Sequence, residues 1–216
     1  MKLQWYGHAC FLLTAENGTR ILTDPCAPKT GHDLHDIACE GITSSHGHYD
    51  HNYFEAAIGD PTVCNEVGTY ELGGIRITAL PSFHDEEQGA KRGTNLIFVY
   101  EIDGLRIVHF GDLGHQLPEE TVAAIGKPDI LLCPIGGTYT LDAAGAAKAG
   151  AVLQPKVFVP MHYKTPALTL NIGGLDEFLK EMGDTPVQKL NDTCCTFTSD
   201  TLPEVQRIVV FDYATC

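Results

Sequence analysis

Three histidines and an aspartate lie within six residues, in the segment His46-Gly47-His48-Tyr49-Asp50-His51. Neutral imidazole and carboxylate groups are suitable ligands for zinc, iron or manganese. If the segment follows a strand, His46 and His48 point the same way, because alternate residues of an extended chain share a face. Asp50 and His51 then face an adjacent point. One short segment can therefore supply two ligands to each of two neighbouring metal ions, and this spacing predicts a metal site rather than a solvated loop.

A cluster of four residues cannot complete two metal sites, so other parts of the chain must contribute. Four later residues are available, namely His84, Asp112, His115 and His162. Three of them end stretches with strand character, and His115 closely follows Asp112. Strand ends at one edge of a sandwich can converge on a single cleft, where polar residues belong to sites more often than to cores. Taken singly, these residues could equally be a loop histidine, a turn aspartate and a buried histidine.

The order of these residues resembles the ligand set of the metallo-β-lactamase superfamily, over most of the chain from residue 1 to about residue 170. Within it, four segments are similar to those of the small bacterial metal-dependent hydrolases related to ascorbate-phosphate lactonase. These segments are Tyr6-Gly7-His8-Ala9-Cys10-Phe11, Ile21-Leu22-Thr23-Asp24-Pro25, Pro134-Ile135-Gly136-Gly137 and Pro160-Met161-His162-Tyr163. The resemblance implies an α+β fold, a four-layer αββα sandwich, and the activity of a metal-dependent hydrolase.

The resemblance also implies a role for each ligand. A first metal is expected on His46, His48 and His84, and a second on Asp50, His51 and His162. Asp112 would bridge the two. His109 and His115 match no ligand position and are expected to be structural or to support the ligands, whereas His32 and His35 are expected in surface loops near the cleft rim.

Further residues are expected to support the ligands or to meet the substrate. A metal-bound imidazole needs its other ring nitrogen held by a carboxylate or carbonyl, a role expected for Asp24, with His8 beside it. On its own Asp24 is as well explained as a turn residue, and the resemblance decides between the two roles. Gly136 and Gly137 would let backbone amides approach the substrate, or merely form a turn. Lys164 could bind an anionic group or remain a solvated lysine.

Two divalent ions roughly 3.5–4 Å apart can share a water and lower its pKa toward neutrality. The expected cofactors are therefore two zinc ions, with manganese or iron as alternatives, and a bridging hydroxide as nucleophile. Asp50 is expected to be a ligand that also orients the hydroxide. The predicted activity is cleavage of a small ester, lactone or phosphoester. The alternatives are iron- or manganese-dependent redox or sulfur chemistry on the same ligands, and a non-catalytic metal-binding or sensing protein.

The composition of the chain indicates its domain organisation and the kinds of molecule that it can bind. The chain has 216 residues, of which 44% are hydrophobic, and this predicts a single domain over residues 1–216. A net charge of −14 argues against nucleic acid as a partner, but bound metals can reverse the sign of the charge in a cleft, so the small-molecule substrate can be anionic.

No export signal or long apolar run is visible, so a cytoplasmic protein without a membrane partner is expected. The eight cysteines are expected to be reduced, and the related group suggests a homo-oligomer.

The elements that must position these residues can be read from hydrophobic patterns. Strands are expected at residues 3–6, 10–14, 20–23, 41–44, 62–64, 69–72 and 75–80, followed by a hairpin of residues 95–102 and 105–110. Residues 50–58 are expected to be helical, with Asp50 as the N-cap. In the second half, helices at residues 119–125, 141–153 and 175–182 alternate with strands at residues 130–133, 157–159, 187–190, 195–198 and 208–211. This order predicts two sheets with helices outside.

Overall fold

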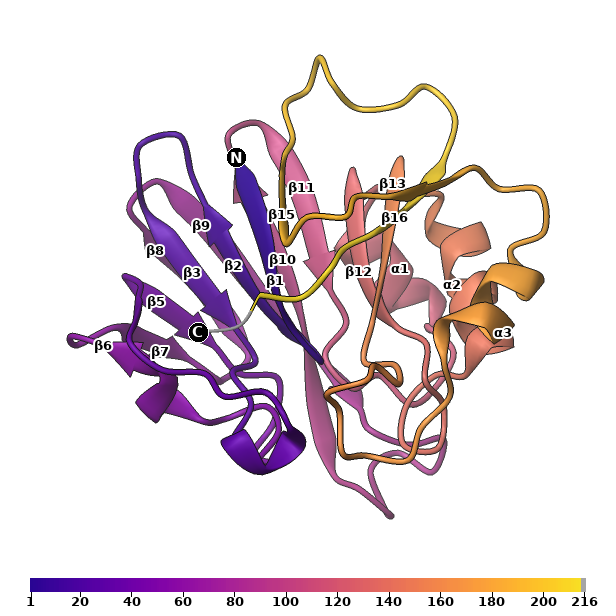
Figure 1. The fold of residues 1–216 in the computed structure, drawn as a ribbon, viewed down its shortest axis with the longest axis horizontal. Coiled ribbons are helices and arrows are strands. Elements are labelled where there is room, and N and C mark those ends of the chain that lie inside the picture. The colour runs from indigo at the N-terminus through magenta and orange to yellow at the C-terminus, as the bar shows by residue number, and fades with distance from the viewer. Residues whose placement is uncertain (215–216) are drawn as a thin grey trace.

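The computed structural model describes residues 1–214, in which two β-sheets pack face to face and three α-helices cover one outer side (Figure 1). The first sheet has six strands in the order β15-β1-β2-β3-β5-β7. Its strands are β1 (Lys2–Gly7), β2 (Cys10–Thr14), β3 (Arg20–Thr23), β5 (Gly41–Thr43), β7 (Thr62–Cys64) and β15 (Cys194–Thr196). This arrangement confirms the α+β sandwich predicted from the sequence.

The second sheet has eight strands in the order β14-β16-β13-β12-β11-β10-β9-β8. Its strands are β8 (Gly68–Leu72), β9 (Ile75–Phe83), β10 (Thr94–Ile102), β11 (Leu105–His109), β12 (Ile130–Pro134), β13 (Val157–Met161), β14 (Val187–Lys189) and β16 (Arg207–Val210). Strands β8 to β11 are antiparallel neighbours, whereas β11, β12, β13 and β16 are parallel neighbours. Parallel neighbours need crossover connections, which contain helices α1 (Glu119–Ile125), α2 (Ala143–Leu153) and α3 (Leu175–Glu181).

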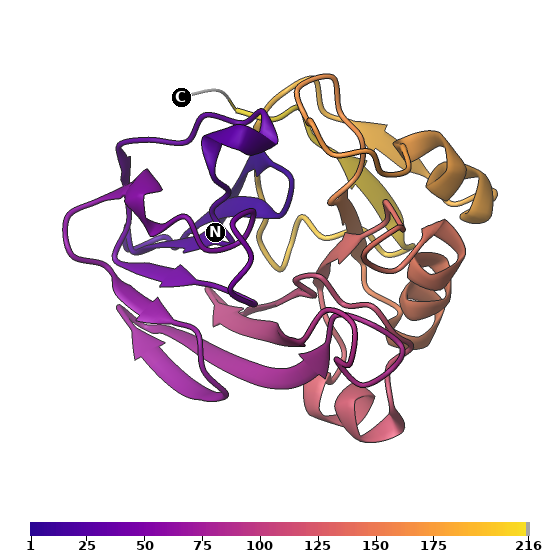
Figure 2. The same ribbon diagram turned by 90° about the horizontal axis from the view of Figure 1, so that it is seen from below.

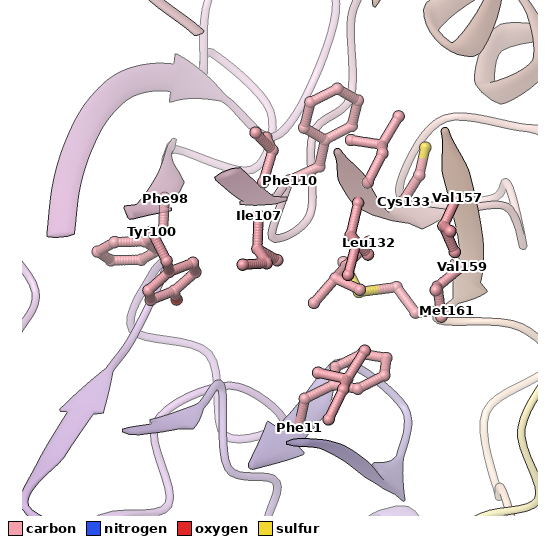
Figure 3. Packing of buried hydrophobic residues seen from close by; sticks show 14 of the residues in the cluster. Phe11, Phe98, Tyr100, Ile107, Phe110, Leu132, Cys133, Val157, Val159 and Met161 are labelled. Atoms are coloured by element: carbon pink, nitrogen blue, oxygen red, sulfur yellow. The ribbon is translucent and has the colours of Figure 1, made fainter. Parts of the chain in front are cut away.

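The main core lies between the two sheets. Phe11 of β2 faces Leu132 of β12 and Met161 of β13 across this gap, and all three are fully buried (Figure 3). Full burial of one such side chain stabilises the fold by about 1.5–3 kcal/mol. The opposite face of the second sheet packs on the helices, where the rings of Phe158 in β13 and Phe178 in α3 lie 4.8 Å apart.

The two outer faces are covered differently. Within residues 1–214 all three α-helices lie outside the second sheet (Figure 2). The segments before and after β5 cover the first sheet with 3₁₀ turns at Pro28–Thr30 and Phe54–Ala56 and a small sheet of β4 (Ile37–Ala38) and β6 (Ala57–Ile58). A second hydrophobic cluster fills this interface, formed by Cys10, Leu12, Leu22, Cys26, Leu34, Ile37, Cys39, Ile42 and Ala56.

Most predicted strands and all three helices of the second half are confirmed within a few residues. The predicted helix over residues 50–58 is wrong, since only the 3₁₀ turn Phe54–Ala56 and the short β6 form there. Part of the backbone in this region bonds to the neighbouring segment: Ala27 N–H donates to the Tyr49 carbonyl and Tyr53 N–H donates to the Pro25 carbonyl, so that only single turns form locally. None of the helices in residues 1–214 is long and apolar enough to span a membrane.

Candidate metal centre

Six strand ends bring the candidate ligands to one edge of the sandwich. In the first sheet β1, β3 and β5 run in the same direction, and so do β9, β11 and β13 in the second. Each of these strands is followed at once, or within a few residues, by site residues: His8, Asp24, residues 46–51, His84, Asp112 and His162. The structure thus gathers residues that lie far apart in the sequence, three segments from each sheet.

The gathered side chains form two groups around Asp112. The first ligand set consists of His46, His48 and His84, and the second ligand set consists of His8, Asp50, His51 and His162. Within each set the candidate ligand atoms lie within 4.8 Å of one another. The sequence expectation placed His8 outside the ligands, whereas the structure places one of its ring nitrogens among the ligand atoms of the second set.

The carboxylate of Asp112 faces both sets with different oxygens. Its Oδ2 lies 3.2 Å from His84 Nε2 and 3.9 Å from His46 Nε2. Its Oδ1 lies 3.1 Å from His51 Nε2 and 3.2 Å from His162 Nε2. The side chain is almost fully buried. A carboxylate with one oxygen directed to each set has the arrangement needed to bridge two cations.

The histidine rings are held from behind by oxygen atoms. His51 Nδ1 lies 2.8 Å from Asp24 Oδ2, His46 Nδ1 lies 3.0 Å from Ser45 Oγ, and His84 Nδ1 lies 3.1 Å from the Tyr139 carbonyl. With Nδ1 engaged in this way, Nε2 of each ring is left to face the centre. This is how metal-ligating histidines are usually oriented.

Asp24 makes the largest number of these supporting contacts behind the histidine rings. Besides His51 it accepts hydrogen bonds from Ser45 N–H at 2.7 Å and from Ser45 Oγ at 2.6 Å, and it has no exposed surface. One buried carboxylate therefore positions a ligand of the second set directly and His46 of the first set through Ser45. A simple turn residue would not need these partners.

Three site residues have strained backbones. His8, Asp24 and His162 have φ values of 53°, 38° and 50°, in the left-handed region that non-glycine residues rarely occupy. Each comes directly after a strand, and His162 N–H donates to the His8 carbonyl at 3.0 Å. Strain of this kind persists where the surrounding structure enforces it and is concentrated at functional sites.

Burial keeps two rings neutral. The pKa of His8 is lowered to about 3, first by burial and then by neighbouring His162. The pKa of His46 is also lowered to about 3, first by burial and then by His51. Neutral imidazole offers a lone pair to a cation, so these rings are in the ligand form at physiological pH.

Charged neighbours oppose the effect of burial on three other side chains of the centre. Burial alone would lower the pKa of His51, but Asp112 and Asp24 raise it well above its usual value. Burial alone would raise the pKa of Asp112, but His162 and His51 lower it well below its usual range. Burial likewise opposes the ionisation of Asp50, but its hydrogen bond with His8 keeps the pKa low. Buried carboxylates need compensating positive charge, which divalent cations can supply.

The donor atoms that face the centre fit a metal. Among the described residues, four buried atoms around Asp112 have no hydrogen-bond partner: His46 Nε2, His51 Nε2, His162 Nε2 and Asp112 Oδ1. His51 and His162 nevertheless lie close to Asp112 Oδ1, without the direction of a hydrogen bond. Buried polar atoms are seldom left unpaired. Atoms that converge in this way are arranged to share a cation, and imidazole with carboxylate suits zinc, manganese or iron.

Asn95 is a positioning residue that the sequence did not indicate. Its Oδ1 accepts Asp112 N–H at 2.8 Å, and its Nδ2 donates to Ser82 Oγ at 2.8 Å and to the Phe110 carbonyl at 2.9 Å. It is completely buried in β10. The only signal in the sequence was an amide side chain next to the apolar run of residues 96–100.

A cleft of about 370 Å³ opens onto the centre. It is lined by His48, Tyr49, Asp50, His84, Arg92, Asp112, Tyr139 and Leu170. A larger groove of about 750 Å³ lies alongside, and His48 and Arg92 line both. The smaller cleft gives access to the candidate ligands of both sets, because Asp50, His84 and Asp112 line it and do not line the groove.

Three expected substrate contacts have other roles in the structure. Gly136 N–H donates to the His162 carbonyl and Gly137 N–H donates to the Leu141 carbonyl, both at 3.1 Å, so neither is free to stabilise an oxyanion. A Cβ on Gly136 would lie 2.4 Å from the His162 carbonyl oxygen, so this glycine allows the close packing behind His162. Lys164 Nζ donates to the carbonyls of Leu168 and Leu170, and so shapes a loop that lines the cleft.

The remaining histidines lie outside both ligand sets. The prediction that His32 is a surface residue is wrong: it is buried, with its ring against Gly7 and edge-on to Tyr213 at 5.0 Å. His109 is also buried, and its Nε2 donates to the Ala9 carbonyl at 2.9 Å, which ties the two sheets together. His115 Nε2 accepts Phe83 N–H at 3.2 Å, directly before His84. His35 is exposed.

Comparison with known proteins agrees with this geometry. Residues 2–162 match the family model of the β-lactamase superfamily domain. A UPF0173 metal-dependent hydrolase from Archaeoglobus fulgidus is 33% identical over 196 residues, which covers 76% of this chain and 84% of that protein.

Solved structures show the same relationship. A candidate Zn-dependent hydrolase of the metallo-β-lactamase superfamily from Thermotoga maritima is 34% identical, with a TM-score of 0.81 and 99% of both chains covered. A diiron β-hydroxylase from Streptomyces venezuelae is 15% identical, with a TM-score of 0.59 over 85% of this chain and 49% of that chain, and shares the fold alone.

Proposed function

The chain belongs to the metallo-β-lactamase superfamily, and from that membership we propose that it is a hydrolase that binds two divalent cations, one on each ligand set. Zinc is the proposed metal, because imidazole groups outnumber carboxylates in both sets. The proposed substrate is a small molecule with an ester, lactone or phosphoester bond. Lactones are included among these substrates because the segments around His8, Asp24 and Gly136 resemble those of lactonase-like hydrolases.

The observation that carries the proposal is the position of Asp112 between the two sets. Its two oxygens face different histidine pairs, and three buried histidine nitrogens around it, together with its own Oδ1, lack a hydrogen-bond partner within the described part of the chain. A single cation on the second set would leave His46 and His84 facing Asp112 Oδ2 without a shared ion. Two cations satisfy both sides of the carboxylate.

When bound, such cations supply Lewis acidity and a water with a pKa near neutrality. The protein contributes the positions of the reacting groups. Asp50 borders the cleft, and His8 Nε2 lies 3.2 Å from its Oδ2, so that the carboxylate is held where it would bind a cation and orient a water beside it. Tyr49, Tyr139 and Leu170 form walls that limit the access of solvent. Asp24 and Asn95 fix the ligands, so little reorganisation is needed during the reaction.

The proposal is tested by metal analysis combined with a substrate panel. We expect two equivalents of zinc in protein purified without added metal, and hydrolysis of at least one class among simple esters, lactones and phosphodiesters. Asp112→Asn should lose both the metal and the turnover, whereas Asp129→Asn, at a carboxylate that pairs with Lys156, should keep both. Two bound metals without any turnover would favour a metal-binding or sensing protein instead.

Iron is the second candidate metal. Asp50 and Asp112 add two carboxylates to the histidines, a donor set that also suits iron or manganese, and the related fold of a diiron β-hydroxylase accommodates iron. If the purified protein contained stoichiometric redox-active iron, the proposal of a zinc hydrolase would give way to that of an oxidative enzyme with iron on the same ligands. The metal analysis distinguishes the two.

A further inference from the structure

Among the described residues that line the 370 Å³ cleft at the metal centre, here called the metal cleft, Arg92 is the only lysine or arginine. It lies in the loop between β9 and β10, close in sequence to the ligand His84. The Asp85 carboxylate fixes this loop, because it accepts four backbone N–H groups, from Glu87, Gly89, Lys91 and Arg92, at 2.7–3.0 Å. His84 N–H donates to the Gly93 carbonyl at 3.1 Å and closes the loop on the metal centre. The position of Arg92 relative to His84 is therefore rigidly set.

The guanidinium is held at the cleft by the segment that also holds His84. Arg92 Nη2 donates to the Thr138 carbonyl at 3.1 Å, and its Cζ lies 5.5 Å from the centre of the Tyr139 ring, within cation–π range. The carbonyl of Tyr139 is the one that faces His84 Nδ1. Thr138 has a φ of 63°, a genuine strain for a β-branched residue. Such strain at a cleft wall marks a conformation that the fold enforces.

Arg92 has no carboxylate partner among the described residues, in contrast to most arginines of the chain. Arg20, Arg76 and Arg106 each reach a glutamate, and Arg207 meets Gln188. In a chain with a net charge of −14, an arginine that faces the cleft without an acidic partner is unusual. The guanidinium has five N–H donors in a planar fork, and the single bond to Thr138 leaves others for a ligand.

We propose that Arg92 binds an anionic group of the substrate, a carboxylate or a phosphate, beside the metal centre. The proposal rests on the proposed hydrolase function and narrows its substrate to anionic molecules. Guanidinium binds both groups with paired, charge-assisted hydrogen bonds. Arg92 takes the role that the sequence suggested for Lys164, whose ammonium group is bonded to backbone carbonyls.

The kinetic test uses two esters that differ by a terminal carboxylate, 4-nitrophenyl butyrate and mono-4-nitrophenyl glutarate. We expect zinc-loaded Arg92→Met to lose about 10- to 100-fold in kcat/KM for the glutarate ester, with little change for the butyrate ester. Arg92→Lys should be intermediate, because it keeps the charge without the fork. Lys91→Met is the matched control: it removes the adjacent cation, which pairs with Glu87 and does not line the metal cleft.

A binding test separates this proposal from the proposed function. Glutarate and methylphosphonate are titrated calorimetrically into the zinc-loaded wild type, Arg92→Met and Lys91→Met. Weaker binding of either anion in Arg92→Met alone supports the proposal even if no ester is cleaved, and the anion that loses more identifies the group. If neither anion binds the wild type, or if both bind Arg92→Met as tightly as the wild type, the proposal is overturned even when ester hydrolysis confirms the function.

Discussion

The two ligand sets that flank Asp112 differ in their exposure. All four members of the second set are buried, and His51 and His162 have no exposed surface. In the first set His84 is buried, His46 is partly buried and His48 is exposed. His48 also borders both the cleft and the larger groove. One set is enclosed by protein and the other is open to solvent.

The support behind the two sets differs in the same direction. The second set contains His8 and His162, which have strained backbones and are joined through a backbone hydrogen bond, and its His51 contacts Asp24 directly. In the first set the His84 ring is held by the Tyr139 carbonyl and the His46 ring by Ser45, but His48 lies where solvent reaches it. Closed metal sites are typical of structural roles, and open ones leave a position for water or substrate. We therefore expect the second set to hold a bound cation more firmly, and the first set to face the substrate.

The largest effect is expected from Asp112→Asn, because Asp112 is the residue shared by both sets. Loss of the charge leaves the histidine nitrogens on both sides without a bridging carboxylate. Since even outer partners of metal ligands contribute 10- to 100-fold to affinity or activity, we expect a loss of more than about 100-fold in kcat/KM. Metal content, measured by mass spectrometry, should fall on both sets together. Loss of one metal with the other retained would show that Asp112 serves one set only.

Chelation should remove the two metals in order. A chelator reaches the exposed first set sooner, so the first equivalent lost should abolish turnover and change Tm little. Loss of the second equivalent should lower Tm by several degrees, because a cation that binds only the folded state stabilises it and because Asp50 and Asp112 then lack compensation. Metal content, activity and Tm are followed in the same samples. Simultaneous loss of both metals with a single drop in Tm would contradict the proposed division of roles.

A smaller and more selective effect is expected from Asp24→Asn. The direct contact of Asp24 with His51 Nδ1 supports the second set, and its effect on the first set passes through Ser45. We expect the affinity of one metal to fall by about 10- to 100-fold, with the other changed less. Stepwise zinc titration with a competing chelator measures both constants. Equal weakening of the two would show that Ser45 transmits the whole effect to His46.

Most of the fold and most of the candidate ligands could be predicted from the sequence. Hydrophobic alternation indicated the strands, and the clustered histidines of residues 46–51 indicated a metal site, since both signals are local. The roles of His84, Asp112 and His162 came from the resemblance to the metallo-β-lactamase superfamily, because the convergence of distant strand ends is not visible in the sequence. The predicted helix at residues 50–58 is wrong because Tyr53 N–H donates to the Pro25 carbonyl, a tertiary contact that a helix would not allow. Arg92 and Asn95 were missed for a similar reason: their roles arise only when the loop between β9 and β10 and the strand β10 are placed beside Asp112. Gly136 looked like a substrate contact, yet its amide is used by His162.

The smallest effect is expected from Asp85→Asn, which loosens only the loop beside the first set. Burial alone would raise the pKa of Asp85, but the N–H groups of Arg92, Glu87, Lys91 and Gly89 lower it below its usual 3.8. A carboxylate with a lowered pKa stabilises the folded state at pH values above its unfolded pKa, and this contribution fades as the pH falls through the folded value. The difference in Tm between wild type and variant should thus be full at pH 7 and shrink below about pH 4.

Asp85→Asn should also reduce kcat/KM for the glutarate ester by less than Arg92→Met does, and leave the metal affinity of the second set unchanged. Asp60→Asn, at an exposed carboxylate outside both sets and outside the loop, provides the comparison. A Tm difference that stays constant down to acidic pH would mean that the carboxylate charge of Asp85 does not hold the loop. Weaker metal binding in the second set would mean that the two halves of the centre are coupled more tightly than their separate supports indicate.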